Sequence, residues 1–405
     1  MLVLGRVTAP THFQYIMNNI NSIGFALDPN NTPSFLLDWE VTKRCNLDCS
    51  YCGTIPQWGL QAGHDNNTEH PVLADCLKTI DFMYEYVDLY MQHKKPSQRK
   101  VVLNVYGGES LFHPNIIEIL EACHSKYQQY KDKWFLTITC TTNGVVGTNQ
   151  WERIVPLIDE FTVSYHSESL PKQKQQFKDN ILYLKKQNKR VKCVVLMHNA
   201  PELFADSEKI IEFCKENEIR YVAKPLDNIE PEWAYNQEQF NKFKTIWINR
   251  VSSIQKNSYA EQIEVIGNKD KIQSIEEGRS CCGGRKLSLN GDLKSSIGFV
   301  PRQGFEGWFC SVNWFFLFVR QLDGSVFTNK DCKTSTSGKV EPLGNLSNTT
   351  KILDTLRDQL DNRAMPIIQC VKAVCRCGFC SPKAETKEDF MALIKRNVPN
   401  DIFQH

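Results

Sequence analysis

A chain of 405 residues exceeds the size of one small domain, so we expect two structural units. Its 41% hydrophobic and 11% aromatic residues can form large cores, which excludes a disordered or fibrous protein. The 48 basic and 46 acidic residues nearly cancel, and this balance gives no reason to expect a nucleic acid or a membrane surface as partner.

The amino-terminal sequence MLVLGRVTAPTHF lacks the charged and apolar regions of a secretory signal, and no later stretch has the apolar length of a membrane span. We therefore expect a cytoplasmic protein. In that reducing compartment the 16 cysteines are not expected to form a disulfide framework. Clustered cysteines then indicate metal ligands, whereas five scattered ones indicate small buried side chains: Cys76, Cys123, Cys140, Cys193 and Cys214.

Extended apolar runs alternate with segments of helical spacing along the first half of the chain, and helical spacing is clear at 114–130 and 206–218. This order predicts an α/β fold with parallel strands and helical crossovers, as an open doubly wound sheet or a partial barrel. Functional groups should lie at the carboxyl ends of the strands. The six expected strands are 34–41, 100–106, 135–142, 159–166, 190–197 and 219–225.

The pattern changes after Pro225 to an expected helical segment at 236–257, followed by a region rich in cysteine, glycine and aromatic residues. Short strands in that region are expected to turn at Asn290-Gly291 and Asp323-Gly324, which are hairpin signals. We therefore divide the chain into an amino-terminal extension, a core, a helical linker and a small Cys-rich α+β domain: 1–33, 34–230, 231–280 and 281–405.

Three cysteines lie in the loop that follows the first predicted strand: Cys45, Cys49 and Cys52. A protein-bound 4Fe–4S cluster normally takes four thiolates, so three on one loop would leave one iron open to an exogenous ligand. Structural zinc is the alternative, but it requires a fourth protein ligand, and His64 is the only histidine close in sequence.

The stretch Cys45-x-x-x-Cys49-x-Tyr51-Cys52 resembles the signature of the radical S-adenosylmethionine (SAM) superfamily. The resemblance implies a partial (β/α)6 TIM-like barrel over about 34–226. It also implies that SAM occupies the open iron and is cleaved reductively to methionine and a 5′-deoxyadenosyl radical. Tyr51 corresponds to the aromatic residue that lies near the adenine in that family.

Three further strand ends resemble SAM-binding elements of the same family. In YGGES, Gly107, Gly108 and Glu109 correspond to the element that binds the SAM amino group, although Glu109 could instead favour a helix N-terminus. In TTNG and VSYHSE, Asn143 and Ser164 are the expected cofactor contacts. A turn role for Asn143-Gly144, and a purely structural role for His166, remain open.

The later cysteines resemble the auxiliary-cluster extension called SPASM, or its shorter relative the twitch domain. The interval from Gly324 to the next cysteine is longer than usual, and the final cysteine spacing departs from the full motif. We expect one auxiliary 4Fe–4S cluster, with structural zinc as the alternative. Its expected ligands are Cys310, Cys332, Cys377 and Cys380, and the substitutes, or ligands of a second site, are Cys281, Cys282, Cys370 and Cys375.

Family members with this extension often modify peptides or protein side chains, so the resemblance implies a peptide substrate and an electron donor such as flavodoxin or ferredoxin. Radical modification of a small metabolite and a non-catalytic iron–sulfur or zinc scaffold are the alternatives. No residue can be assigned as catalytic acid, base or radical partner. Spare cysteines, such as Cys281, Cys282 and Cys370, are candidates for a hydrogen-atom donor.

Overall fold

The three-dimensional structure is a computed structural model of the chain. The residues that it describes are 23–24, 35–52, 65–94, 96, 99–226, 235–239, 241–242, 287–289, 292–297, 307–310, 312–328, 342–369, 383–384, 386–388 and 390–391.

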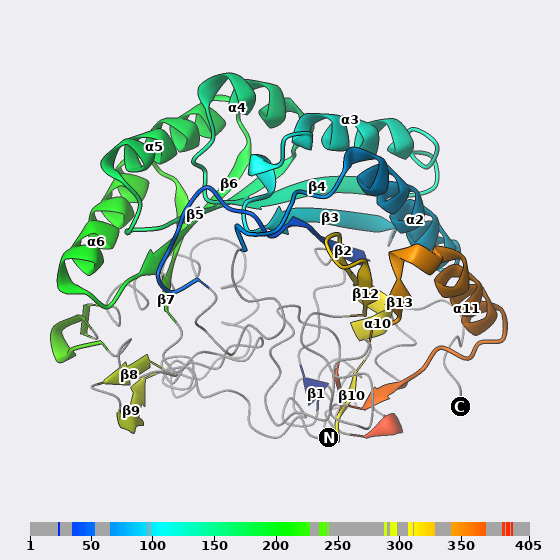
Figure 1. The fold of residues 1–405 in the computed structure, drawn as a ribbon. Coiled ribbons are helices and arrows are strands. Elements are labelled where there is room, and N and C mark those ends of the chain that lie inside the picture. The colour runs from blue at the N-terminus through cyan, green and yellow to red at the C-terminus, as the bar shows by residue number, and fades with distance from the viewer. Residues whose placement is uncertain are drawn as a thin grey trace, which may run out of the picture.

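A curved sheet organises these residues, and six of its nine strands form a parallel run in chain order (Figure 1). All six strands predicted from the sequence are present, and their parallel pairing confirms the α/β fold. Among the described residues no strand pairs with the outer edge of β7, so the run is open there, as in a partial barrel. Its strands are β2 (Phe35–Thr42), β3 (Lys100–Gly107), β4 (Phe135–Thr142), β5 (Glu160–Tyr165), β6 (Arg190–Met197) and β7 (Arg220–Pro225).

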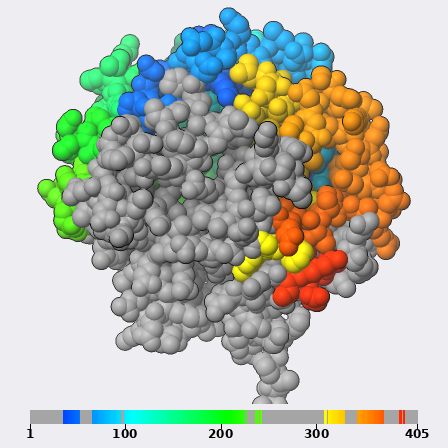
Figure 2. Space-filling view, turned by 60° about the horizontal axis from the view of Figure 1, so that its bottom comes forward, coloured from blue at the N-terminus to red at the C-terminus, as the bar shows by residue number. Residues whose placement is uncertain are grey.

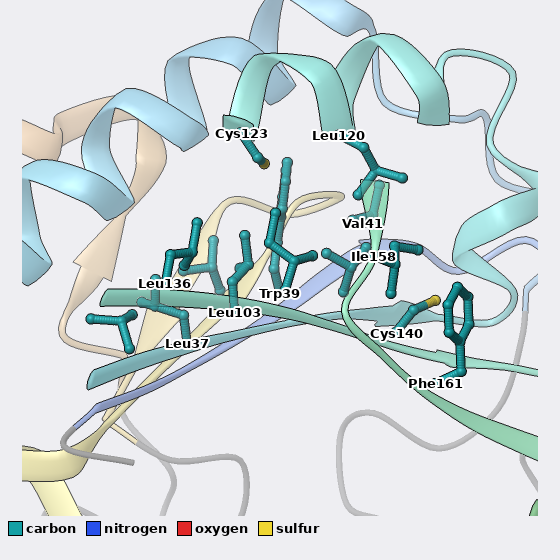
Figure 3. Packing of buried hydrophobic residues seen from close by; sticks show 14 of the residues in the cluster. Leu37, Trp39, Val41, Leu103, Leu120, Cys123, Leu136, Cys140, Ile158 and Phe161 are labelled. Carbon is teal, nitrogen blue, oxygen red and sulfur yellow. The ribbon is translucent and has the colours of Figure 1, made fainter. Parts of the chain in front are cut away.

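Five helices cover the convex face of this run and connect its strands (Figure 1). Alternate residues of each strand point toward the helices, so Leu37, Trp39 and Leu103 are fully buried in the main core (Figure 3). The helices are α2 (Leu73–Gln92), α3 (Ile116–Tyr127), α4 (Thr148–Ile154), α5 (Pro171–Lys186) and α6 (Pro201–Glu216). The five scattered cysteines are buried in this core, as predicted: Cys76, Cys123, Cys140, Cys193 and Cys214.

Three strands from the C-terminal region extend the same sheet beyond β2. Strand β11 (Phe316–Arg320) pairs with β2 in parallel, and β12 (Ser325–Phe327) and β13 (Gly344–Asn345) continue the sheet antiparallel. The predicted hairpin at Asp323-Gly324 is present, with Gly324 at φ 71°. The expected domain limits remain a prediction, but these strands share one sheet with the core.

Helix α11 (Thr349–Asp361) follows β13 and packs beside α2, where Arg357 forms an ion pair with Glu85. In Figure 2, α11 (orange) borders the yellow segment that contains β11 and β12. Leu353, Leu356 and Leu360 carry the apolar face of α11 into the main core. The C-terminal region is therefore joined to the core by backbone pairing and by side-chain packing.

The remaining described elements are short. Strands β1 (Ile23–Gly24), β15 (Lys383–Ala384), β10 (Phe309–Cys310) and β14 (Ile368–Gln369) form a four-stranded sheet, and β8 (Leu287–Leu289) pairs with β9 (Asp292–Ile297). Helix α10 (Val312–Phe315) precedes β11, and single 3-10 turns occur at Ser110–Phe112, Val155–Leu157 and Leu346–Asn348. Most of the predicted helical segment 236–257 lies outside the described residues. In the described part of the chain, no helix has the length and apolarity that crossing a membrane requires.

Candidate functional site

The three-cysteine loop directly follows β2 and lies at the carboxyl ends of the parallel strands. Cys49 is buried, Cys45 and Cys52 are half-buried, and the amide of Cys52 donates to the Cys49 carbonyl at 2.9 Å. All three thiols belong to one small apolar cluster with Leu47 and Tyr51 of the loop. The same cluster includes Val145 after β4, Leu196 near the end of β6 and Leu226 after β7. This placement is consistent with the prediction that functional groups lie at the carboxyl ends of the strands.

The cysteine loop lies against the end of β3 at Gly107 and Gly108. The amide of Gly108 donates to the Thr42 carbonyl at 2.9 Å, and the amide of Glu109 donates to the Arg44 carbonyl at 2.8 Å. A Cβ on Gly107 would lie 2.2 Å from the Thr42 carbonyl oxygen, and one on Gly108 would lie 2.3 Å from that of Lys43. The close approach that requires glycine here is made by the loop backbone, and a contact of these glycines with SAM remains a prediction.

Glu109 links the loop, β3 and β4 through a carboxylate that is only 1% exposed. One oxygen accepts from the Leu111 amide at 3.0 Å and the other from the Asn143 amide at 2.6 Å, so Glu109 caps the 3-10 turn Ser110–Phe112. This is the N-terminal role that the sequence left open. Burial raises the pKa of Glu109 to about 7. A carboxylate has about four acceptor positions, so these bonds leave capacity for an ammonium ligand.

Asn143 joins the cysteine loop to the turn after β4. Its side-chain amide donates to the side-chain oxygen of Asn46 at 2.7 Å and lies 3.7 Å from the Cys45 sulfur. Its own side-chain oxygen accepts from the Val145 amide at 2.8 Å. Gly144 has φ 71°, and a Cβ there would lie 2.6 Å from Val163, so the turn role of this pair is present as well. Asn46 had no sequence signal beyond its place between two cysteines.

The segment after β5 brings His166 against the same loop. His166 Nδ1 lies 2.7 Å from the Tyr51 hydroxyl oxygen and 3.4 Å from the Cys49 sulfur, and the two rings are stacked with an interplanar angle of 5°. Burial, with a contribution from the charge of Lys224, lowers the pKa of His166 to about 4, which keeps the imidazole neutral. Ser164 is half-buried on the face of β5 opposite Val163 and Tyr165, and its contact with SAM remains a prediction.

A second group of contacts around the loop was not predicted from the sequence. Glu168 accepts from the Ser50 amide at 2.6 Å and from the Ser50 hydroxyl at 2.5 Å, and it pairs with His198 Nε2 at 3.1 Å. His198 follows β6, so residues after two neighbouring strands hold the stretch between Cys49 and Cys52. The available signal was their position directly after a predicted strand, which does not by itself indicate a partner.

The donor set of the loop suits an iron–sulfur cluster. The sulfur of Cys45 has the Leu47 amide at 3.4 Å and the Asn143 side-chain amide at 3.7 Å, and such N–H groups stabilise a thiolate. Within the described residues, no group of three or more His, Cys, Asp or Glu side chains is spaced to hold a single metal ion. A four-iron cluster places each thiolate on a different iron, so its thiols need not converge on one point.

Of the expected auxiliary ligands, Cys310 alone lies in the described part of the chain. It is 2% exposed in β10 and packs with Val312, Phe316, Phe318 and Phe327. The other seven are outside the described residues, and the auxiliary site remains a prediction: Cys281, Cys282, Cys332, Cys370, Cys375, Cys377 and Cys380.

The concave face of the sheet carries polar side chains near the loop. The Asn104 amide donates to Asp38 at 2.7 Å, and its oxygen accepts from the Thr139 and Thr141 hydroxyls at 3.2 and 3.3 Å. The side chain of Arg320 on β11 lies 3.5 Å from that of Glu40 on β2. Strand alternation places these groups opposite the apolar face that packs against the helices.

No protein-family model and no curated protein matches the chain. Among solved structures, native anSMEcpe with bound AdoMet and Kp18Cys peptide is similar at 14% identity and a TM-score of 0.45, covering 79% of this chain and 80% of that one. A hexahistidine-tagged form of anSMEcpe with bound AdoMet gives 14% identity and a TM-score of 0.46, covering 85% and 86%. Values this low say nothing about the activity of this chain.

Proposed function

We propose that the protein is a radical SAM enzyme whose first cluster is held by Cys45, Cys49 and Cys52. When bound, the cluster would pass one electron to SAM, and the resulting 5′-deoxyadenosyl radical would remove a hydrogen atom from the substrate. This proposal rests on the resemblance of the cysteine loop and three strand ends to that superfamily. The structural observation that supports it most is the joining of the loop to the ends of β3, β4 and β5 around the thiols.

The residues of the chain would contribute binding, orientation and exclusion of water. Tyr51, Gly107, Gly108, Glu109, Asn143 and Ser164 are the proposed SAM contacts. The bonds from Gly108 and Glu109 to the loop fix the cysteines relative to Glu109, the proposed partner of the SAM ammonium. The apolar cluster around Tyr51 would keep water from the reactive bond. No described side chain is assigned as an acid, a base or a radical partner.

For the substrate we propose a peptide or a protein side chain. The polar concave face formed by Asp38, Asn104 and Thr139 supports a substrate with hydrogen-bonding groups. We further propose that the enzyme works in the cytoplasm with a flavodoxin- or ferredoxin-type electron donor. One auxiliary 4Fe–4S cluster is proposed in the C-terminal region, with Cys310, Cys332, Cys377 and Cys380 as its ligands.

The test is anaerobic reconstitution with iron and sulfide, followed by addition of SAM and dithionite. We expect the wild-type protein to form 5′-deoxyadenosine and to change its electron paramagnetic resonance (EPR) signal when SAM is added. Cys49→Ala should lose the iron of one cluster and all cleavage of SAM. The matched control Cys214→Ala alters a cysteine of the helix-side core and should retain both.

Two outcomes would reject the proposal. A wild-type protein that holds its cluster but neither changes its signal with SAM nor forms 5′-deoxyadenosine would be an iron–sulfur scaffold. A loop that binds zinc and excludes iron would reject the cluster itself. The substrate class is tested by incubating the enzyme with deuterium-labelled short peptides and, separately, with labelled sugars or nucleosides. Mass spectrometry then shows which substrate transfers deuterium to 5′-deoxyadenosine.

A further inference from the structure

The Cys49 sulfur lies beside two aromatic side chains, Tyr51 and His166, and the proposed function gives His166 no role. His166 Nδ1 is 3.4 Å from this sulfur and 2.7 Å from the Tyr51 hydroxyl oxygen, and the Tyr51 hydroxyl also hydrogen-bonds Cys49. Cys45 receives its N–H groups from Leu47 and Asn143, so Cys49 differs from it in having a phenol and an imidazole as neighbours.

The direction of these bonds depends on which nitrogen of His166 carries the hydrogen. A neutral imidazole has one N–H, and a phenol has one O–H with lone pairs that accept. If Nδ1 carries the hydrogen, its best acceptor is the hydroxyl oxygen at 2.7 Å, because the sulfur is farther away. The Tyr51 hydroxyl then has its own hydrogen free to donate to the Cys49 sulfur. The opposite tautomer would turn the hydroxyl hydrogen toward His166 and away from the thiolate.

The surroundings hold this geometry in place. Tyr51 is 3% exposed, and its ring is stacked on that of His166 at a centroid distance of 6.0 Å. The neighbouring residue Ser50 is bound through its amide and hydroxyl to Glu168, two residues beyond His166. One short segment after β5 therefore fixes both Ser50 and Tyr51, and the phenol has little freedom to rotate away from the sulfur.

We propose that His166 is a positioning residue that directs the Tyr51 hydroxyl hydrogen toward the Cys49 thiolate and so sets the reduction potential of the cluster. This inference rests on the proposed function, because it requires a cluster bound at Cys49. Reduction adds a negative charge to the cluster and its thiolates, and a hydrogen bond to a thiolate stabilises that charge. The His166–Tyr51 pair therefore raises the potential and makes the first cluster easier to reduce.

The test is an EPR-monitored redox titration of the reconstituted full-length protein without SAM. His166→Phe keeps an aromatic ring against Tyr51 but loses Nδ1, and we expect the reduction equilibrium to become at least tenfold less favourable, which is 59 mV for one electron. His166→Asn places an amide N–H at the position of Nδ1 and should restore most of the potential. His124→Phe is the control, because His124 lies on α3 at the convex side of the sheet, where its Nε2 bonds the Leu157 carbonyl at 2.9 Å, and its replacement should leave the potential unchanged.

A double-mutant cycle separates a relay from a direct bond. If His166 acts through the tyrosine, Tyr51→Phe and His166→Phe lower the potential by similar amounts, and the double variant is no lower than either. If the shifts in reduction potential of the two single variants add in the double variant, the relay from His166 through Tyr51 to Cys49 is wrong. A His166→Phe protein with wild-type iron content and wild-type potential would also overturn it. Failure of the proposed function looks different: the wild-type protein would then hold no redox-active cluster at the loop or form no 5′-deoxyadenosine.

Discussion

Substitution of Gly108 by alanine should detach the cysteine loop from the end of β3. The new Cβ would lie 2.3 Å from the Lys43 carbonyl oxygen and 2.6 Å from that of Arg44, and both atoms belong to the backbone. To reach an ordinary contact of 3.4 Å the first carbonyl must retreat by about 1 Å. Cys45 is the next residue after Arg44, so the displacement reaches a proposed cluster ligand directly.

The expected loss of stability can be built from two contributions. Forcing an extra methyl group into a packed site costs about 1–3 kcal/mol. The hydrogen bonds from Gly108 to Thr42 and from Glu109 to Arg44, at 2.9 and 2.8 Å, contribute about 1 kcal/mol each and are strained by the same movement. We therefore expect Gly108→Ala to lower the free energy of unfolding by about 3–5 kcal/mol, or to leave the loop detached with the sheet intact.

Urea denaturation of the metal-free protein and iron content after reconstitution are the two assays. Gly147→Ala is the control, because a Cβ there meets nothing within 4 Å; its cost as an N-cap change should stay at about 1 kcal/mol or less. Gly108→Ala should lose iron from the first cluster, whereas Gly147→Ala should retain it. A Gly108→Ala protein with wild-type stability and iron content would show that this close approach is not what holds the loop.

Three further predictions concern stability. Between pH 4.5 and about 7 the folded state holds the Glu109 proton more tightly than the unfolded state. The free energy of unfolding should therefore fall as pH rises, by up to about 1.4 kcal/mol per pH unit. Glu109→Gln should remove this slope in urea titrations at several pH values, and an unchanged slope would contradict the effect of burial on Glu109. Lys94 is buried against the rings of Trp314 and Phe315, and burial lowers its pKa to about 7. Stability should therefore rise from pH 7 toward 10, and Lys94→Met should flatten that rise in the same titrations. Leu356→Ala should lower the free energy of unfolding by about 2–5 kcal/mol, measured by thermal or urea unfolding, because Leu356 is buried in the main core. Arg357→Ala removes the half-exposed ion pair with Glu85 and should cost under about 1 kcal/mol. Equal losses would show that the ion pair contributes as much as apolar packing to holding α11 on the core.

The parallel strands could be predicted because buried and half-buried residues alternate along them. In β4, Leu136, Ile138 and Cys140 are buried, while Thr137 and Thr139 between them face the concave side. Such a pattern depends only on neighbouring residues. The pairing of β11 with β2 has no comparable signal, because periodicity shows which face of a strand is buried and not which distant strand lies beside it.

The site was predictable to the same extent. The loop cysteines and Glu109 stand in recognisable spacings after strands, and the structure places them together. Glu168 and His198 lacked such a spacing, since a carboxylate after one strand and a histidine after the next become partners only once the strands are adjacent. From the sequence, Gly107 and Gly108 were expected to let a ligand approach the backbone closely. In the structure, the atoms that a Cβ on either glycine would meet are backbone atoms of the cysteine loop.

The β2–β11 pairing also sets an order of events at the ribosome. Leu36 emerges 280 residues before its partner Phe316, which at about 5–20 residues per second is a delay of about 15–60 s. For that interval the first parallel strand has one bare edge, and bare edges of apolar strands invite pairing with other nascent chains. A chain terminated before β11 would keep that edge permanently, so such fragments should aggregate even though every strand of the partial barrel has been made.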